Sequence, residues 1–165
     1  MANYSLKKSY QLKNLREIIF KDLWGEHGVF TTMWIFGKPA KILFFKNHIK
    51  NLIKSLKFYG ITKKSLKKDI SKILNSNLLQ DKKYNHLLRI ALNKQVISIS
   101  LRKRVKPKMN FDLKLVNLRR EKPQYKNLKY KKILSHLAKL DNSRSDIGLV
   151  VNNKILETGT SNLLF

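Results

Sequence analysis

The sequence predicts an α/β fold, and three observations predict it. Several stretches carry apolar residues at helical spacing, others are apolar runs of strand length, and polar turns separate the two kinds. Hydrophobic residues make up 42% of the 165 residues, which is enough for a packed core. Helical spacing is found at 44–61, 65–74 and after Lys126, and strand patterns are found at 29–36, 87–92, 95–101, 111–118, 147–151 and 154–156.

The charge of the chain is strongly basic, with 36 Lys and Arg against 10 Asp and Glu and a formal net charge of +26. Such an excess is typical of proteins that bind polyanions. The lysines are spread from end to end, however, so we expect weak, salt-sensitive binding to polyanions and no specific nucleic-acid partner. A basic protein whose main role is polyanion binding remains an alternative.

The absence of cysteine excludes disulfides and thiolate metal sites and favours a reducing cytoplasm. No run of about 18 apolar residues is present, so we expect neither a transmembrane helix nor a membrane partner. No metal site is expected.

The first 24 residues show a basic amphipathic pattern, in which leucines and isoleucines recur among lysines. A targeting presequence has a similar pattern, but Glu17, Asp22 and the low serine content argue against one. Glycines at 25 and 28 then predict a turn before the strand at 29–36, which Gly37-Lys38-Pro39 closes.

The middle of the chain predicts two helices followed by three strands. In 44–61 the inward face carries Ile49, Leu52, Ile53 and Leu56, and Gly60 is the stop signal. Ser65 is placed to cap the second helix. The strands at 87–92 and 95–101 pair around Asn93-Lys94, and a basic loop at 102–108 precedes the strand at 111–118.

The segment RREKP at 119–123 has the composition of a linker between domains. We therefore predict a small N-terminal α/β domain at 1–118, a linker at 119–124, and the start of a larger C-terminal α/β domain at 125–165. The apolar spacing after Lys126 predicts about four helical turns. Asn152-Asn153 then predicts a two-residue hairpin between 147–151 and 154–156.

Two residues of this last segment suggest chemistry. Lys126 immediately precedes the predicted helix, and Glu157 follows 31 positions later at the end of the predicted hairpin. The two side chains can therefore face one pocket. A lysine amine that is neutral can attack an aldehyde, and burial near other cations lowers the pKa of such an amine. A carboxylate held against a ring nitrogen keeps that nitrogen protonated.

Three segments resemble the catalytic half of the class IV pyridoxal-phosphate (PLP) enzymes, namely KNLKYKKIL, SDIGLVVNNKILE and ETGTSNLLF. That family includes branched-chain and D-amino-acid aminotransferases and aminodeoxychorismate lyase. The resemblance implies a two-domain α/β fold with PLP as cofactor, Lys126 as the Schiff-base lysine and Glu157 as partner of the pyridine nitrogen. It also implies that Tyr130 contacts the ring hydroxyl, whereas Lys129 stands where the family usually has asparagine.

Two N-terminal stretches extend the resemblance. GEHGVFTT is similar to the family's glycine-rich opening, with Thr31 where many transaminases carry glutamate, which favours the lyase branch. In 44–61, His48, Leu52 and Ser55 match a family helix. Asn51 stands at the position where family members have the arginine that binds the cofactor phosphate. Asparagine donates a hydrogen bond but brings no charge.

The resemblance thus implies a lyase that converts 4-amino-4-deoxychorismate to 4-aminobenzoate and pyruvate, as in folate biosynthesis. A branched-chain or D-amino-acid aminotransferase is the alternative, and an inactive remnant is another. The inactive remnant is suggested by Asn51, which replaces the family's arginine, and by the end of the sequence at Phe165. Family members continue well beyond the position of Phe165, so the C-terminal domain is expected to be incomplete. The expected partners are a small substrate with carboxylates and a second copy of the chain in a homodimer.

Overall fold

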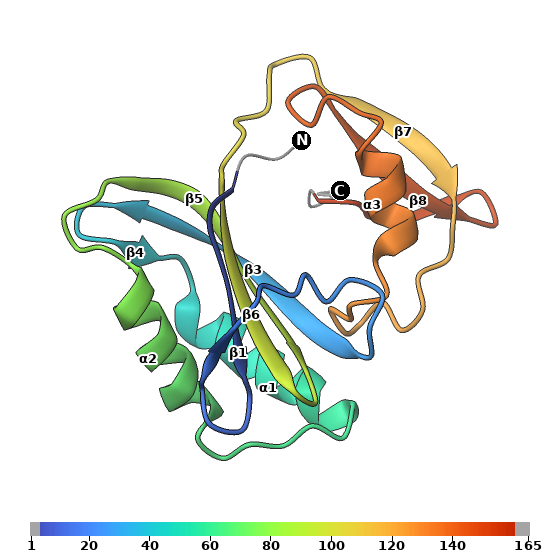
Figure 1. Ribbon diagram of the computed structural model, residues 1–165. Helices are drawn as coiled ribbons and strands as arrows, with labels where there is room; N and C mark the ends of the chain where they lie inside the picture. Colours follow the sequence, from blue (N-terminus) through green and yellow to red (C-terminus); the bar gives the residue numbers. More distant parts are fainter. Residues whose placement is uncertain (1–3, 161–165) are drawn as a thin grey trace. The chain divides into compact units, whose positions relative to one another are not determined.

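The computed structural model describes residues 4–160, which form two compact units (Figure 1). Among the described residues, the N-terminal unit contains 4–104 together with 124–128, and the C-terminal unit contains 105–123 and 129–160. The sequence placed the boundary after residue 118. The strand at 112–117 instead belongs to the C-terminal unit, because it hydrogen-bonds with the strand at 145–151.

A six-stranded antiparallel sheet forms the centre of the N-terminal unit, in the order β2-β1-β6-β5-β3-β4. Its edge strands have two residues each and pair with their inner neighbours at two positions each. The strands are β1 (Tyr4–Gln11), β2 (Glu17–Ile18), β3 (Gly28–Gly37), β4 (Lys41–Ile42), β5 (Tyr84–Asn93) and β6 (Val96–Lys103).

The N-terminal segment, in which the sequence shows a basic amphipathic pattern, forms the hairpin β1–β2. The register of β1 against β6, with Lys7 opposite Ser100, makes successive side chains alternate between the two faces of the sheet. The two adjacent lysines of β1 therefore lie on opposite faces, with Lys7 exposed and Lys8 half-buried.

Two helices, α1 (Phe45–Phe58) and α2 (Leu66–Asn77), cover one face of this sheet (Figure 1). Their predicted positions are confirmed, with α2 three residues longer at its end than the sequence indicated. Both helices bury aliphatic side chains against β3, β5 and β6. The fully buried members of that core include Met33, Ile35, Ile49, Leu56, Ile70, Leu88, Ile90, Leu92, Ile97 and Ile99.

The predicted pairing of β5 and β6 is also confirmed. At their turn, the Asn93 side-chain oxygen accepts hydrogen bonds from the backbone N–H groups of Gln95 at 2.8 Å and Val96 at 2.7 Å. The side chain of Asn93 thus satisfies two backbone N–H groups of the turn.

The C-terminal unit is a three-stranded sheet in the order β7-β8-β9 with one short helix. Strand β7 (Asp112–Asn117) runs parallel to β8 (Ser145–Val151), and α3 (Lys131–Leu137) lies between them in sequence. Strand β9 (Lys154–Thr158) returns antiparallel to β8. The predicted hairpin is confirmed, since Asn152 and Asn153 both have positive φ values, 49° and 59°.

Helix α3 is shorter than the four turns that the sequence predicted. Its seven residues begin at Lys131, because the segment before them takes part in the N-terminal sheet. Within residues 4–160, no helix is long and apolar enough to cross a bilayer.

Candidate active site

The backbone around Lys126 is fixed to the first residues of β3. The Phe30 N–H donates to the Lys126 carbonyl oxygen at 2.7 Å, and the Leu128 N–H donates to the Gly28 carbonyl oxygen at 3.0 Å. Asn127 forms an isolated antiparallel bridge with Val29. The candidate Schiff-base lysine therefore lies at the edge of the N-terminal sheet and not within a helix.

Gly28 makes this attachment possible. A Cβ atom at this position would lie 2.1 Å from the Leu92 carbonyl oxygen and 2.8 Å from a methyl carbon of Leu128. Leu128 itself is fully buried. Only glycine allows β3, β5 and the lysine segment to approach one another this closely.

The residue before the lysine is anchored to the end of α1. The ring of Tyr125 stacks on that of Phe58, with 4.1 Å between the ring centroids and 19° between the ring planes. Tyr59 lies edge-on to Tyr125 at 6.3 Å. Offset and edge-on aromatic contacts of this kind stabilise a fixed position for Tyr125 and so for its neighbour Lys126.

His48 matches a family helix in sequence, but no role at the site was predicted for it. Its Nδ1 lies 2.9 Å from the hydroxyl oxygen of Thr31, across from α1 to β3. Burial lowers the pKa of His48, and the positive charge of Lys126 lowers it further. The imidazole therefore favours its neutral form, in which one nitrogen accepts a hydrogen bond and the other donates one.

Asn51 lies one turn further along α1, where Phe44, Asn47, His48 and Asn51 line a shallow hollow of about 260 Å³. The hollow offers two side-chain amides close to the N-terminus of a 14-residue helix. Amide donors and the positive end of a helix dipole both suit a phosphate. These residues thus fit the anionic end of PLP, although none of them carries the fixed charge of arginine.

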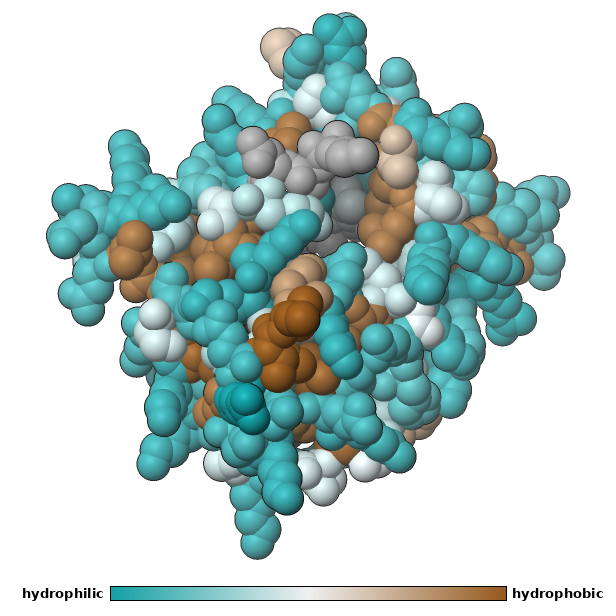
Figure 2. Space-filling model, viewed as in Figure 1, coloured by the Kyte–Doolittle hydropathy of each residue, from teal (hydrophilic) through white to brown (hydrophobic). Residues whose placement is uncertain are grey.

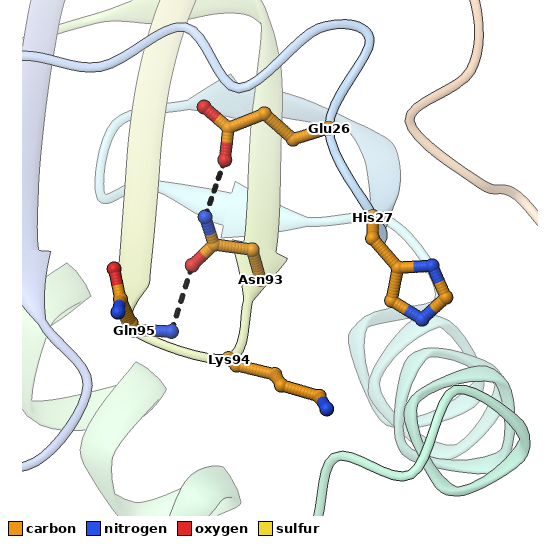
Figure 3. Close-up of a pocket in the computed structure, with 5 residues that line it drawn as sticks. All are labelled: Glu26, His27, Asn93, Lys94 and Gln95. Carbon is orange, nitrogen blue, oxygen red and sulfur yellow. Dashed lines mark hydrogen bonds between the residues drawn. The ribbon is translucent and has the colours of Figure 1, made fainter.

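A larger hollow of about 480 Å³ lies beside the β5–β6 turn and the loop before β3 (Figure 3). The Asn93 amide nitrogen donates to a carboxylate oxygen of Glu26. His27 points away from Glu26 in Figure 3 and lies edge-on to Tyr59 at 4.9 Å. Glu26 and Asn93 therefore stabilise the turn, and this hollow brings no carboxylate to the imidazole of His27.

The C-terminal unit carries Glu157 on β9 in contact with Arg120. A carboxylate oxygen of Glu157 lies 3.2 Å from Nη1 of Arg120, whose side chain is only 8% exposed. The other terminal nitrogen of Arg120 donates to the Pro123 carbonyl oxygen. Burial raises the pKa of Glu157, and the charge of Arg120 opposes that rise.

Tyr130 belongs to the same cluster. Its hydroxyl donates to the Gly159 carbonyl oxygen at 2.7 Å, and the Arg120 guanidinium lies 5.7 Å from the centre of its ring. Burial raises the pKa of Tyr130, while Arg120 acts in the opposite direction. The phenol is therefore a hydrogen-bond donor fixed next to the turn that follows Glu157.

Asp146, at the start of β8, holds that turn. Its carboxylate is fully buried and accepts hydrogen bonds from both the N–H and the hydroxyl of Thr160 at 2.9 Å. A Cβ atom on Gly159 would lie 2.7 Å from the same carboxylate. The turn after Glu157 is thus defined by one buried carboxylate and one glycine, which the sequence alone did not pair.

The four residues predicted for the site divide between the two units. Lys126 and Asn51 lie in the N-terminal unit, where the structure adds the contact between His48 and Thr31. Glu157 and Tyr130 lie in the C-terminal unit, where the structure adds Arg120 and Asp146. Among residues 4–160, no group of three or more His, Cys, Asp or Glu side chains is arranged to bind a metal ion.

Comparison with known proteins gives a family match. The family described as amino-transferase class IV matches residues 28–165, a range that includes all four predicted residues. No curated protein sequence matches the chain significantly.

Solved structures share the fold at low sequence identity. A branched-chain aminotransferase from Thermoproteus uzoniensis is 15% identical with a TM-score of 0.67, and the match covers 92% of this chain and 62% of that one. An aminotransferase from Brucella abortus bound to PLP is 14% identical with a TM-score of 0.61, covering 94% and 66%.

A third structure, from Legionella pneumophila, is provisionally named a 4-amino-4-deoxychorismate lyase. It is 19% identical with a TM-score of 0.55, and the match covers 81% of this chain and 56% of that one. This chain therefore spans less than two thirds of the length of each of the three proteins.

Proposed function

The chain belongs to the class IV aminotransferase family, and from that premise we propose that it acts, or forms part of a protein that acts, as a PLP-dependent enzyme. The observation that carries the proposal is the position of Lys126 and Glu157 in the family's two catalytic motifs, each in a fixed local setting. Lys126 is attached to β3 through its own carbonyl, and Glu157 is ion-paired with Arg120.

When bound, PLP supplies an electron-accepting ring for substrates that carry an amino group. Lys126 would hold the cofactor covalently through its amine and then move a proton at the reacting carbon. Glu157 would hold the ring nitrogen, and Arg120 would keep the carboxylate of Glu157 ionised. Asn51, with Asn47, would hold the phosphate at the start of α1.

As the reaction we propose the elimination that converts 4-amino-4-deoxychorismate to 4-aminobenzoate and pyruvate. The family resemblance supports this choice, because Thr31 stands where many transaminases carry glutamate. A branched-chain or D-amino-acid aminotransferase remains the alternative, and the name of the Thermoproteus structure supports that reaction equally. A homodimer in the cytoplasm is part of the same proposal, supported by the family resemblance and the lack of cysteine.

The decisive test is the site of covalent attachment. The protein is incubated with PLP and reduced with borohydride, and peptides are analysed by mass spectrometry. We expect one predominant adduct on Lys126, lost in Lys126→Gln and retained in Lys131→Gln, whose side chain is exposed. Adducts spread over many surface lysines would overturn the proposal.

The two reactions are separated by their products. Pyruvate released from 4-amino-4-deoxychorismate without an added oxo acid supports the lyase. Amino-group transfer that requires an oxo acid supports the aminotransferase. Because the chain spans only part of its structural relatives, both assays follow the adduct measurement. They use unreduced, PLP-loaded protein from a preparation whose borohydride-reduced sample gave the adduct on Lys126.

A further inference from the structure

Helix α1 presents a row of four lysines to solvent, Lys46, Lys50, Lys54 and Lys57, hereafter the lysine row. At 3.6 residues per turn these positions lie within about 80° of the helix circumference and extend about 17 Å along its axis. The buried residues of α1, which include Ile49, Leu52 and Leu56, occupy the other side of the helix. The row is therefore a continuous cationic strip on an otherwise well-packed helix.

The charges of the lysine row are not balanced by α1 itself, which has no acidic residue. In the part of the chain that the structure describes, no ion pair involves any of these four lysines. Like charges four residues apart on a helix repel each other. A row of negative charges on a ligand would relieve that repulsion.

The surrounding sequence strengthens the local charge. Residues 45–77, one fifth of the chain, contain nine lysines and one aspartate, a net +8 of the total +26. That aspartate, Asp69, pairs with Lys63 at 2.8 Å and accepts a hydrogen bond from Ser65. The layer of α1 and α2 is thus more basic than the average of the chain, and its acidic residue is already used.

An exposed aromatic ring lies at the start of the row. Phe44 is 66% exposed and immediately precedes α1, with its backbone in the left-handed region at φ 50°. Proteins that bind single-stranded nucleic acids without sequence preference combine cations along the phosphates with aromatic rings that stack on bases. A bilayer would instead require the apolar face of the helix, which here is buried against the sheet.

We propose that the outer face of α1 binds single-stranded nucleic acid, with the lysine row along the phosphates and Phe44 stacking on a base. The binding reads no sequence, because lysine-phosphate and stacking contacts do not distinguish bases. It goes beyond the diffuse attraction expected from the net charge, since it assigns the contact to one helix. It does not depend on the proposed PLP chemistry.

The test compares two variants of equal net charge. In one, Lys46, Lys50, Lys54 and Lys57 are replaced by Gln. In the matched control, four exposed lysines of the C-terminal unit are replaced by Gln, namely Lys106, Lys131, Lys132 and Lys139. Binding of a fluorescent oligothymidylate is measured by anisotropy over a range of salt concentrations. Circular dichroism verifies that both variants fold, and glutamine is as good a helix former as lysine.

We expect the lysine-row variant to lower the slope of log K against log salt by about 3, at about 0.7 per phosphate contact on a single strand. The matched control should change it by less than about 1. Phe44→Leu should weaken binding about fivefold or more with an unchanged slope. Equal losses in the two lysine variants would assign binding to diffuse charge and overturn the proposal.

Two further ligands test the kind of partner. A duplex of the same length should bind more weakly than the single strand, since its bases are stacked on one another and not accessible to Phe44. Phosphatidylserine vesicles should not displace the oligonucleotide from the lysine row. Preferential binding of vesicles, with the same dependence on the lysine row, would assign this face to a lipid surface and overturn the proposal.

Discussion

At the scale of single residues, Arg120 determines the surroundings of Glu157 and Tyr130 within the C-terminal unit. Its guanidinium contacts the Glu157 carboxylate, the Pro123 carbonyl oxygen and the ring of Tyr130, and its side chain is almost entirely buried. A charged group in such a setting stabilises the fold only while its partner is present.

Replacing Arg120 by Met should lower the free energy of unfolding by about 1–3 kcal/mol, because the partly buried carboxylate of Glu157 loses its counter-charge. The pKa of Glu157 should rise further above its ordinary value. Since a carboxyl with a raised folded-state pKa binds its proton more tightly in the folded state, stability should then decrease more steeply as pH rises through that pKa. Urea unfolding at several pH values measures both effects.

The matched control for this experiment is Arg119→Met, because Arg119 is the exposed neighbour of Arg120. We expect its effect to stay within about 0.5 kcal/mol, as for most surface substitutions. Equal effects of the two variants would contradict the importance of the Arg120–Glu157 pair.

His48 gives the second prediction at this scale. Because burial and the charge of Lys126 lower its pKa from 6.5, the unfolded chain takes up a proton that the folded chain resists. Stability should therefore decrease as pH falls below about 6.5, and His48→Gln should remove part of that decrease. In an NMR titration, Lys126→Gln should raise the pKa of His48. An unchanged pKa would show that the Lys126 amine is too far from His48 to affect it.

At the scale of elements, the sequence predicted those parts of the fold that local pattern controls. The helix at 45–58 and the Asn152-Asn153 hairpin follow from periodicity and turn chemistry alone. The first turn predicted after Lys126 did not follow the local pattern, because Asn127 pairs with Val29 of a distant strand. Hydrogen bonds to β3 outweighed the helical spacing of the apolar residues there.

The candidate site was predictable to a similar extent. Lys126, Glu157, Tyr130 and Asn51 could be proposed from the sequence, because each stands in a motif that resembles one of the family, and their roles stay predictions. Arg120 and Asp146 could not, since their partners Glu157 and Thr160 are brought to them only by the pairing of β8 and β9 and its turn.

The attachment of the lysine segment to β3 is tested by Gly28→Ala. The added methyl group would overlap a backbone oxygen of β5, so we expect a loss of about 3 kcal/mol of stability and increased hydrogen exchange at 126–128. Gly60→Asn is the control, because Gly60 has a left-handed backbone, which asparagine tolerates, and no atom within 4 Å of an added Cβ. Hydrogen exchange at 126–128 that stays unchanged in Gly28→Ala would contradict the proposed attachment.

At the scale of the whole chain, a net charge of +26 acts against folding. The face shown in Figure 2 is largely hydrophilic, with smaller hydrophobic patches between. Positive charges at such density repel one another over distances near the Debye length of about 10 Å at 0.1 M salt.

Raising the salt concentration from about 0.05 to 0.5 M should therefore raise the melting temperature by several degrees. The positive charges are closer together in the folded chain than in the unfolded chain, so screening of their repulsion stabilises the folded state more. Thermal unfolding followed by circular dichroism measures the change. A variant with four exposed lysines replaced by glutamine should gain less from salt than the unmodified chain. A melting temperature that falls with salt would show that attractive ion pairs prevail over the repulsion.

The pairing of β1 with β6 has a consequence for biosynthesis. During translation, β1 emerges from the ribosome long before its partner at 96–103 has been made. The backbone N–H and C=O groups of β1 that pair with β6 therefore lack these partners for that time. Contacts of such large sequence separation also form slowly, because loop closure precedes any gain from pairing. The first strand is therefore the segment that a chaperone should contact longest, and site-specific crosslinking of stalled nascent chains should detect it there until residue 103 has left the exit tunnel.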